Sequence, residues 1–332
     1  ATYSKSTPHY HEIVDLPLDL TGVRSARVRS ARAIRLASQY RFQFERAAAA
    51  LDADTTYTRA LAAVERLHLA KRNAKDADSL RRMAIVRRDA GDASELDVLL
   101  ATLNAGQAAN LAAADSITVV STIFDLQAVM GRDNTLLLIT PVDSLTLPPT
   151  PGTEAVSAVA LPVVAAEQAL TAADLSVRVQ RRSLFTPLSI QAGIEHGDPL
   201  EPGLLPTIGL SIPLPLLNRN RGSIAQAEAE RERARAELAL ARIETQTAIG
   251  RALRQRNLAL EKIRRDRLLV ESANRIAAMS LTAYREGAQG LPAVLEAQRN
   301  AREILLQYID DLAEAWIATA TLRLYALTAT SR

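Results

Sequence analysis

The sequence has no cysteine and few aromatic residues. Without cysteine the chain can form neither a disulfide nor a thiolate metal site. Aromatic residues make up only 4% of the chain although 48% of it is apolar, because alanine and leucine dominate the apolar share. Such a composition suits thin layers of helices better than a thick globular core.

Long hydrophobic runs are also missing, since the sequence has no 18 consecutive apolar residues. We therefore predict no ordinary membrane-spanning helix. Membrane strands stay possible, because each needs only about ten residues of alternating hydrophobicity.

Charge of one sign is not in large excess, since 40 basic and 37 acidic residues give a net charge of +3. These residues are mixed along the chain, and no basic run is interleaved with aromatics, so we interpret them as solvated helix faces and expect no nucleic-acid partner. No nucleophile elbow, phosphate loop, zinc signature or catalytic carboxylate pair occurs, so we predict neither an enzyme nor a cofactor. His9 and His11 form a His-x-His pair that could bind metal, but no third ligand accompanies them.

The stretch from Gly209 to Glu230, GLSIPLPLLNRNRGSIAQAEAE, changes its hydrophobic period once. Before Pro213 the apolar residues alternate, as in a half-buried strand. Beyond Ser223 small and apolar residues recur at spacings of three and four, which is typical of a coiled coil. A strand therefore leads directly into a long helix.

The same criteria predict three strands and five helices along the chain. A helix of about 65 residues would be about 100 Å long. Ser94, with Asp97 three residues later, is a plausible N-cap for the second helix. The predicted strands are Tyr10–Leu20, Phe185–Glu195 and Leu205–Pro213, and the predicted helices are Thr21–Asp89, Glu95–Met130, Thr153–Arg182, Gly222–Glu286 and Pro292–Leu327.

An internal repeat appears when the sequence is shifted by 196 residues. Pro17 then aligns with Pro213, and Gly91 aligns with Gly287, so the strand proline and the turn glycine lie 74 residues apart in both halves. A rigid rod that spans a fixed distance requires two helices of the same length, whereas a loose linker does not. The repeat predicts a duplicated unit of strand, long helix, turn and return helix.

The chain resembles the TolC-like outer-membrane efflux proteins, and within them the CzcC-like branch that serves heavy-metal exporters. Three segments carry the resemblance: LSIPLPLLNRNRGSIAQAEAE, its weaker copy VDLPLDLTGVRSARVRSARA, and YREGAQGLPAVLEAQRNAREILLQYIDDL near the end. It implies a mainly helical fold with a small β part: a homotrimer with a barrel in the outer membrane and a helical tunnel in the periplasm. It also implies a periplasmic adaptor and an inner-membrane RND pump as partners.

The resemblance divides the chain into six parts. They are an outer-membrane strand with the preceding extracellular loop (1–20), a first helical hairpin of the tunnel (21–131), an equatorial irregular segment (132–152), a tunnel helix (153–183), an outer-membrane β-hairpin (184–217) and a second helical hairpin (218–332). Family members have two strand hairpins, whereas this sequence shows three strands and begins at what resembles the second. We therefore expect a first strand and helix of about 80 to 100 residues to be missing, as judged from the repeat.

The resemblance assigns roles to the two turns and to the strands, and the behaviour of acidic rings in pores suggests a role for two further residues. The two helix-to-helix turns would close the tunnel and dock the adaptor, through Gly91, Ser94, Val98, Leu99, Arg285, Gly287, Gly290, Val294 and Leu295. Asp89 and Asp92 could form an acidic ring that selects cations, or simply keep the turn solvated. The lipid-facing strand residues would be Val14, Leu16, Leu18, Leu188, Ile190, Ile194, Ile208, Leu210 and Ile212.

We predict a passive trimeric channel of a tripartite efflux system, exporting divalent heavy-metal cations. A channel for drug efflux or type I secretion is an alternative with the same fold. A soluble coiled-coil scaffold is an alternative from another class, and it explains the long helices but not the strands that precede them.

Overall fold

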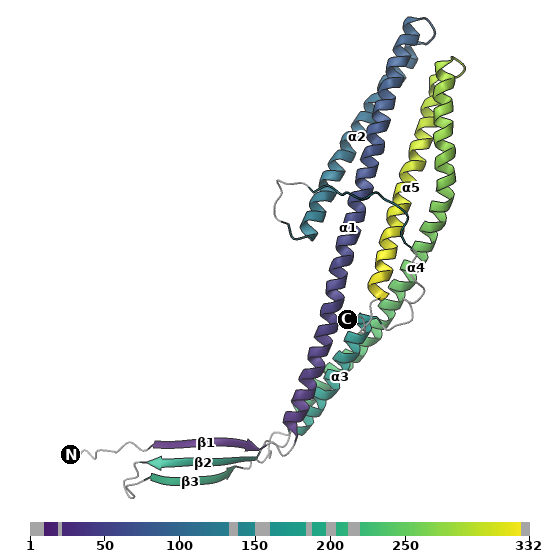
Figure 1. Ribbon diagram of the computed structural model, residues 1–332. Coiled ribbons are helices and arrows are strands. Elements are labelled where there is room, and N and C mark those ends of the chain that lie inside the picture. The colour runs from purple at the N-terminus through teal and green to yellow at the C-terminus, as the bar shows by residue number, and fades with distance from the viewer. Residues whose placement is uncertain are drawn as a thin grey trace, which may run out of the picture. The chain divides into compact units, whose positions relative to one another are not determined.

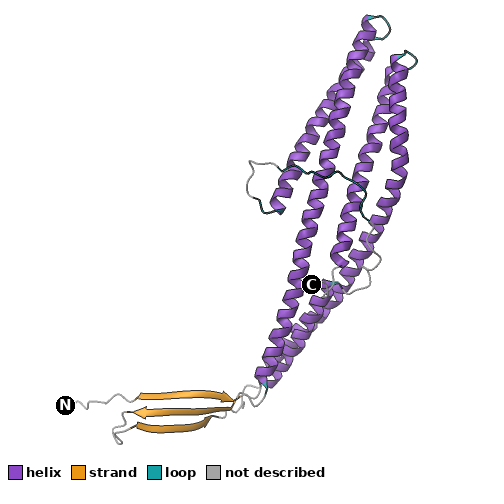
Figure 2. Cartoon of the chain, in the orientation of Figure 1, coloured by secondary structure: helices purple, strands orange, loops and turns teal. Residues whose placement is uncertain are grey.

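The computed structural model describes residues 10–18, 22–132, 139–149, 160–183, 188–196, 204–211 and 220–326. In these ranges the element order is β1 (Tyr10–Leu18), α1 (Val23–Asp89), α2 (Glu95–Val129), α3 (Leu161–Arg182), β2 (Leu188–His196), β3 (Leu204–Ser211), α4 (Arg221–Arg285) and α5 (Leu291–Ala326). Long helices therefore dominate a fold that also contains a small sheet (Figures 1 and 2). The predicted fold class is confirmed.

The chain divides into two compact units, which α1 and α4 both cross. The first unit comprises residues 1–42 and 161–244 and holds the sheet, α3 and the beginnings of α1 and α4. The second unit comprises residues 43–160 and 245–332 and holds α2, α5 and the remainder of α1 and α4.

In the first unit the strands form an antiparallel sheet in the order β1-β2-β3. The register aligns Leu16 with Ile190 and Ile190 with Leu210, so apolar residues of all three strands share one face. Val14, Ile208 and Leu210 are exposed on this face, at 71%, 85% and 59%. The alternation in the sequence has thus produced a sheet with one exposed apolar face.

Both junctions between strand and long helix depend on a residue with positive φ. Gly22, at φ 67°, and Asn220, at φ 50°, each accept the first helical hydrogen bond of the helix that follows. Asn220 Nδ2 also donates to the Gln180 carbonyl and to Ser183 Oγ, each at 3.0 Å. Asn220 thereby attaches the beginning of α4 to the end of α3.

In the second unit α1 with α2, and α4 with α5, form two hairpins whose turns lie at the same end (Figure 1). Residues 139–149 are attached to helices on both sides. Tyr57 of α1 donates a hydrogen bond to Asp143 at 2.6 Å, and Trp316 of α5 donates one to the Thr146 carbonyl. Leu145 from the same segment packs on a buried cluster formed by α4 and α5.

The prediction that no helix could span a membrane was too strong. Among the described residues, α2 is long enough and apolar enough in composition to cross a membrane. An 18-residue window of this helix has a mean hydropathy of 1.2, and 22% of the window is buried. Its many alanines raise the average without forming an unbroken apolar run. One such helix is weak evidence for a span, because a core helix has the same composition.

Element bounds otherwise agree with the sequence within a few residues. The exception is α3, which begins at Leu161, whereas we predicted a helix from Thr153. Residues 153–159 lie outside the described residues, so only the later part of that prediction is tested.

Gly193 allows β1 and β2 to approach, and this generates a first prediction. A Cβ at Gly193 would lie 2.6 Å from the Glu12 carbonyl oxygen, whereas one at Gly209 would come no closer than 3.4 Å, to the flexible Gln191 side chain. We expect Gly193→Ala to increase hydrogen exchange of the β1 amides, and the matched Gly209→Ala to leave it nearly unchanged. Equal effects of the two variants would contradict the close approach.

Candidate functional site

The two helix-to-helix turns share one backbone structure. Gly91 has φ 82° and Gly287 has φ 74°, a region that favours glycine. In the first turn the Asp92 N–H donates to the Arg87 carbonyl at 2.8 Å, and in the second the Ala288 N–H donates to the Ala283 carbonyl at 2.8 Å. Both are Schellman motifs, which satisfy the last carbonyls of a helix. The repeat seen in the sequence therefore extends to backbone geometry.

Ser94 caps α2, as the sequence predicts. Its side chain accepts a hydrogen bond from the Asp97 N–H at 3.1 Å, and the Asp97 carboxylate accepts one from the Ser94 N–H at 3.0 Å. This capping box satisfies two amides at the beginning of the helix. The first turn is therefore held at both ends.

Below the turns the four helices enclose one apolar cluster. Its central members are Val98 of α2 and Val294 of α5, which are 7% and 0% exposed. The whole cluster consists of Leu80, Ala84, Val98, Ala101, Tyr284, Leu291 and Val294. Val98 and Val294 thus pack beneath the turns in this chain, and their contact with an adaptor stays a prediction.

Arg87 of α1 connects the two hairpins. Its guanidinium donates to the Tyr284 carbonyl of α4 and, at 3.3 Å, to the Asp92 carbonyl of the first turn. The same group lies 4.7 Å from the centre of the Tyr284 ring, a cation–π distance. Burial raises the pKa of the Tyr284 hydroxyl, so the ring stays neutral beneath the arginine.

Sequence reasoning missed Arg87 and Tyr284. A basic residue in the last turn of a helix is a weak sign of carbonyl capping. Tyr284 directly precedes Arg285 in the motif that carried the resemblance. The internal repeat does not reveal Arg87 as a functional residue, because the shift of 196 residues aligns Arg87 with Ala283.

The other predicted turn residues are on the surface. Leu99 is 59% exposed, Leu295 is half-buried against the cluster, and Gly91, Ser94, Arg285, Gly287 and Gly290 are exposed. The exposed group forms a surface around the two turns, which we call the tip surface: Gly91, Ser94, Leu99, Arg285, Gly287 and Gly290.

The two acidic residues of the first turn differ in their surroundings. The Asp89 carboxylate lies 2.6 Å from the Arg88 guanidinium, which also pairs with Glu95 at 3.0 Å. These contacts raise the pKa of Arg88, through Asp89 first and Glu95 second. Asp92 is exposed. An acidic ring would therefore depend on Asp92 more than on Asp89, which is paired with Arg88.

The predicted lipid-facing residues share the apolar face of the sheet wherever they are described. Val14, Leu16, Ile190, Ile194, Ile208 and Leu210 are exposed, and Leu18 is half-buried. Leu188 pairs with Leu18, and Ile212 lies outside the described residues.

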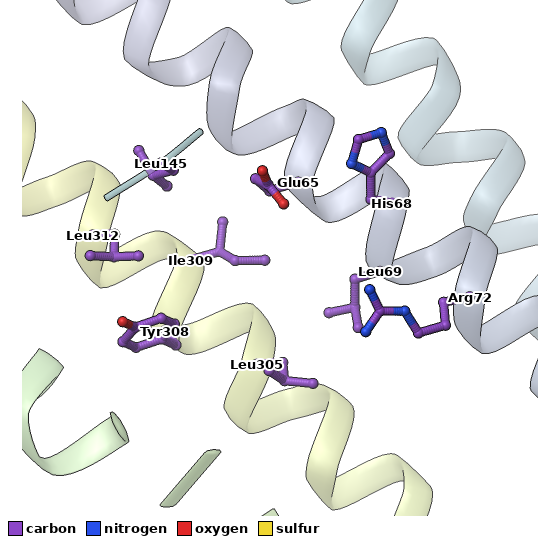
Figure 3. Close-up of a pocket in the computed structure, with 9 residues that line it drawn as sticks. All are labelled: Glu65, His68, Leu69, Arg72, Leu145, Leu305, Tyr308, Ile309 and Leu312. Atoms are coloured by element: carbon purple, nitrogen blue, oxygen red, sulfur yellow. The ribbon is translucent and has the colours of Figure 1, made fainter. Parts of the chain in front are cut away.

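A groove of about 240 Å³ separates α1 from α5 (Figure 3). Its walls are Glu65, His68, Leu69 and Arg72 from α1, Leu305, Tyr308, Ile309 and Leu312 from α5, and Leu145 from the connecting segment. Among the described residues no group of three or more His, Asp or Glu side chains could hold a metal ion. His9 lies outside those residues, so the structure does not describe the His-x-His pair.

The described residues thus combine an antiparallel sheet that has one exposed apolar face with two helical hairpins of similar length. A family model described as outer membrane efflux protein matches residues 13–132 and 160–330. The chain belongs to this family, and is thus an outer-membrane channel protein that extends into the periplasm.

Solved structures agree with the family assignment. A membrane protein from Pseudomonas aeruginosa is 21% identical with a TM-score of 0.81, and the match covers 95% of this chain and 76% of that one. The outer membrane protein VceC from Vibrio cholerae is 16% identical with a TM-score of 0.84, with 96% and 79% covered. The Campylobacter jejuni CmeC outer membrane channel is 16% identical with a TM-score of 0.82, with 95% and 70% covered. No curated protein sequence matches.

The role of Arg87 between the hairpins can be tested. Arg87→Ala removes a charged donor from the Tyr284 carbonyl. We expect this change to lower the free energy of separating the two hairpins at their turns by about 1 to 3 kcal/mol. Hydrogen exchange at Gly287 and Ala288 should increase. Arg88→Ala, whose contacts are to Asp89 and Glu95, is the control and should leave those amides protected. Unchanged exchange in Arg87→Ala would show that the cluster alone holds the turns together.

Proposed function

We propose that this protein is the outer-membrane channel of a tripartite efflux system, a passive conduit through which an inner-membrane RND pump exports its substrate. The observation that carries the proposal is the pair of helical hairpins whose matched turns lie at one end of the second unit. Membership of the outer membrane efflux family supports it. The protein supplies a path, and the pump supplies the energy.

The proposed assembly is a homotrimer. β1 and β3 are the edges of the described sheet, and an open edge cannot be left unpaired in lipid because each unsatisfied backbone group costs several kcal/mol. Strands from further copies would pair these edges and close a barrel. The exposed apolar face carrying Val14, Ile208 and Leu210 would then contact the acyl chains.

The proposed contact with a periplasmic adaptor is the tip surface. Its members are exposed, and the Schellman turns and the buried cluster beneath fix their positions. Leu99 supplies an apolar contact and Arg285 a charged one, a combination common in protein interfaces. Val98 and Val294 support this surface from below.

Two substitutions test docking without disturbing the cluster. Leu99→Asp and Arg285→Glu should each reduce pump-dependent resistance at least tenfold while the trimer still forms in the membrane. Arg275→Glu is the matched control, because Arg275 is 70% exposed on the same helix and pairs with Glu271 on the surface. Full resistance in both tip variants would reject the tip surface as the docking site.

The proposed cargo is a divalent heavy-metal cation. The strand-to-helix motif, LSIPLPLLNRNRGSIAQAEAE, supports this because it resembles the heavy-metal branch of the family. No polar site in the described part of the chain favours one substrate class over another.

Cargo is tested by deleting the gene in its host. We expect the deletion to increase sensitivity to zinc, cobalt and cadmium salts, and the complete gene to restore growth. Sensitivity to hydrophobic drugs alone, or loss of a secreted protein alone, would replace the metal proposal with drug efflux or type I secretion. The channel architecture would stand in either case.

A further inference from the structure

The beginning of α1 carries positive charge without negative charge. Residues 23–44 contain six arginines and no aspartate or glutamate, whereas the whole chain has 40 basic and 37 acidic residues. We call residues 23–35 the arginine segment. Its arginines are all exposed: Arg24, Arg27, Arg29, Arg32 and Arg35.

The arginine segment packs within the first unit through its other face. The buried residues of the segment recur at spacings of three and four, and they are Val23, Ala26, Ser30 and Ala33. Ser30 Oγ donates a hydrogen bond to the Ala172 carbonyl of α3 at 3.4 Å. At about 100° per residue, Arg24, Arg32 and Arg35 project from the opposite side of the helix. The packing of α1 on α3 therefore does not use these charges.

The neighbouring helices do not neutralise the segment. Glu228 of α4, for example, pairs with Arg181 of α3 at 2.6 Å. In the described part of the chain no ion pair involves Arg27, Arg29, Arg32 or Arg35. These four charges therefore have no counter-charge within the described residues.

Positive charge is also unfavourable at this end of a helix. The helix macrodipole places about half a positive charge at the N-terminus, so acidic residues are preferred there. α2 follows this rule and has Glu95 and Asp97 in its first turn, whereas α1 has no acidic residue in its first turn. The macrodipole and the arginines together attract an anion from outside the helix.

A shallow concavity of about 370 Å³ lies among the arginines. It is lined by Arg24, Ser25, Val28, Arg29 and Arg32. A guanidinium group presents a fork of donors that matches two oxygens of a phosphate group. Val28 is 42% exposed and adds an apolar contact beside these donors. Phosphate next to an apolar group is the chemistry of a phospholipid at the membrane surface.

The segment follows directly after the sheet with the exposed apolar face. Four residues separate Leu18, the end of β1, from Val23, the start of α1. Such a connection spans at most about 18 Å. The headgroup layer on each side of a membrane is roughly 5 to 8 Å thick. With the sheet in lipid, the first turns of α1 enter the periplasm close to the phosphate groups.

We propose that the arginine segment binds the phosphate headgroups of anionic phospholipids, such as phosphatidylglycerol, in the leaflet that faces the periplasm. Arg29 and Arg32 are central to this contact, which rests on the contact of the sheet with acyl chains proposed above. The headgroups supply the negative charge that the described residues lack. The contact fixes the depth of the sheet in the membrane.

Electron spin resonance of spin-labelled lipids tests this proposal on the full chain reconstituted in phosphatidylcholine vesicles. The spectra give the number of lipids held at the protein surface and the preference for phosphatidylglycerol over phosphatidylcholine. The wild type should prefer phosphatidylglycerol. Two arginines at an anionic surface contribute roughly 25-fold at their own site, and lipids elsewhere dilute this, so the double variant Arg29→Gln with Arg32→Gln should lower the preference about threefold to fivefold.

The matched control is Arg233→Gln with Arg235→Gln. It removes the same charge from exposed arginines of α4 in the same unit, where Glu237 and Glu232 pair with them. Its preference should equal that of the wild type. Equal binding of the two lipids by the wild type, or the same loss of preference in the control as in the first double variant, would overturn the proposal.

The same spectra separate this proposal from the membrane position of the sheet. The number of phosphatidylcholine molecules held should be equal in the wild type and both variants, because it depends on the apolar face. If no lipid of either kind is held, the sheet does not contact acyl chains and both proposals fail. Loss of the trimer in Arg29→Gln with Arg32→Gln, with an unchanged lipid preference, would place these arginines between copies and would overturn the headgroup contact alone.

Discussion

The nearly equal length of the two long helices is the constraint on which the rest of the structure depends. α1 and α4 have 67 and 65 residues, and they end at Asp89 and Arg285, which the repeat aligns. Because both helices end at equivalent residues, α2 and α5 can begin at the same level and contribute Val98 and Val294 to one buried cluster. A shift of even one turn, about 5.4 Å, would separate these two side chains.

The fold was predictable from the sequence where local chemistry decides it. Alternation around Val14, Ile190 and Leu210 predicted the strands, and Ser94 with Asp97 predicted the capping box. Gly91 and Gly287 predicted the two turns because only glycine readily adopts their φ values. Each of these features depends on neighbours within a few residues, and so it is present in the sequence.

The site was less predictable because it depends on contacts between residues far apart. Nothing local distinguishes Val98, which is buried, from Leu99, which is exposed, since both are apolar residues at the beginning of a helix. The contact of Arg87 with Tyr284 joins residues 197 positions apart, and neither residue has a counterpart that the repeat could reveal.

The central claim is that these duplicated hairpins and strands build a water-filled conduit with further copies of the chain. The most direct measurement is the current across a planar lipid bilayer into which the purified, folded protein has been inserted. The account predicts discrete steps of ion conductance that appear with insertion and are equal from one event to the next. Bilayers that contain folded, inserted protein and yet show no conductance would contradict it.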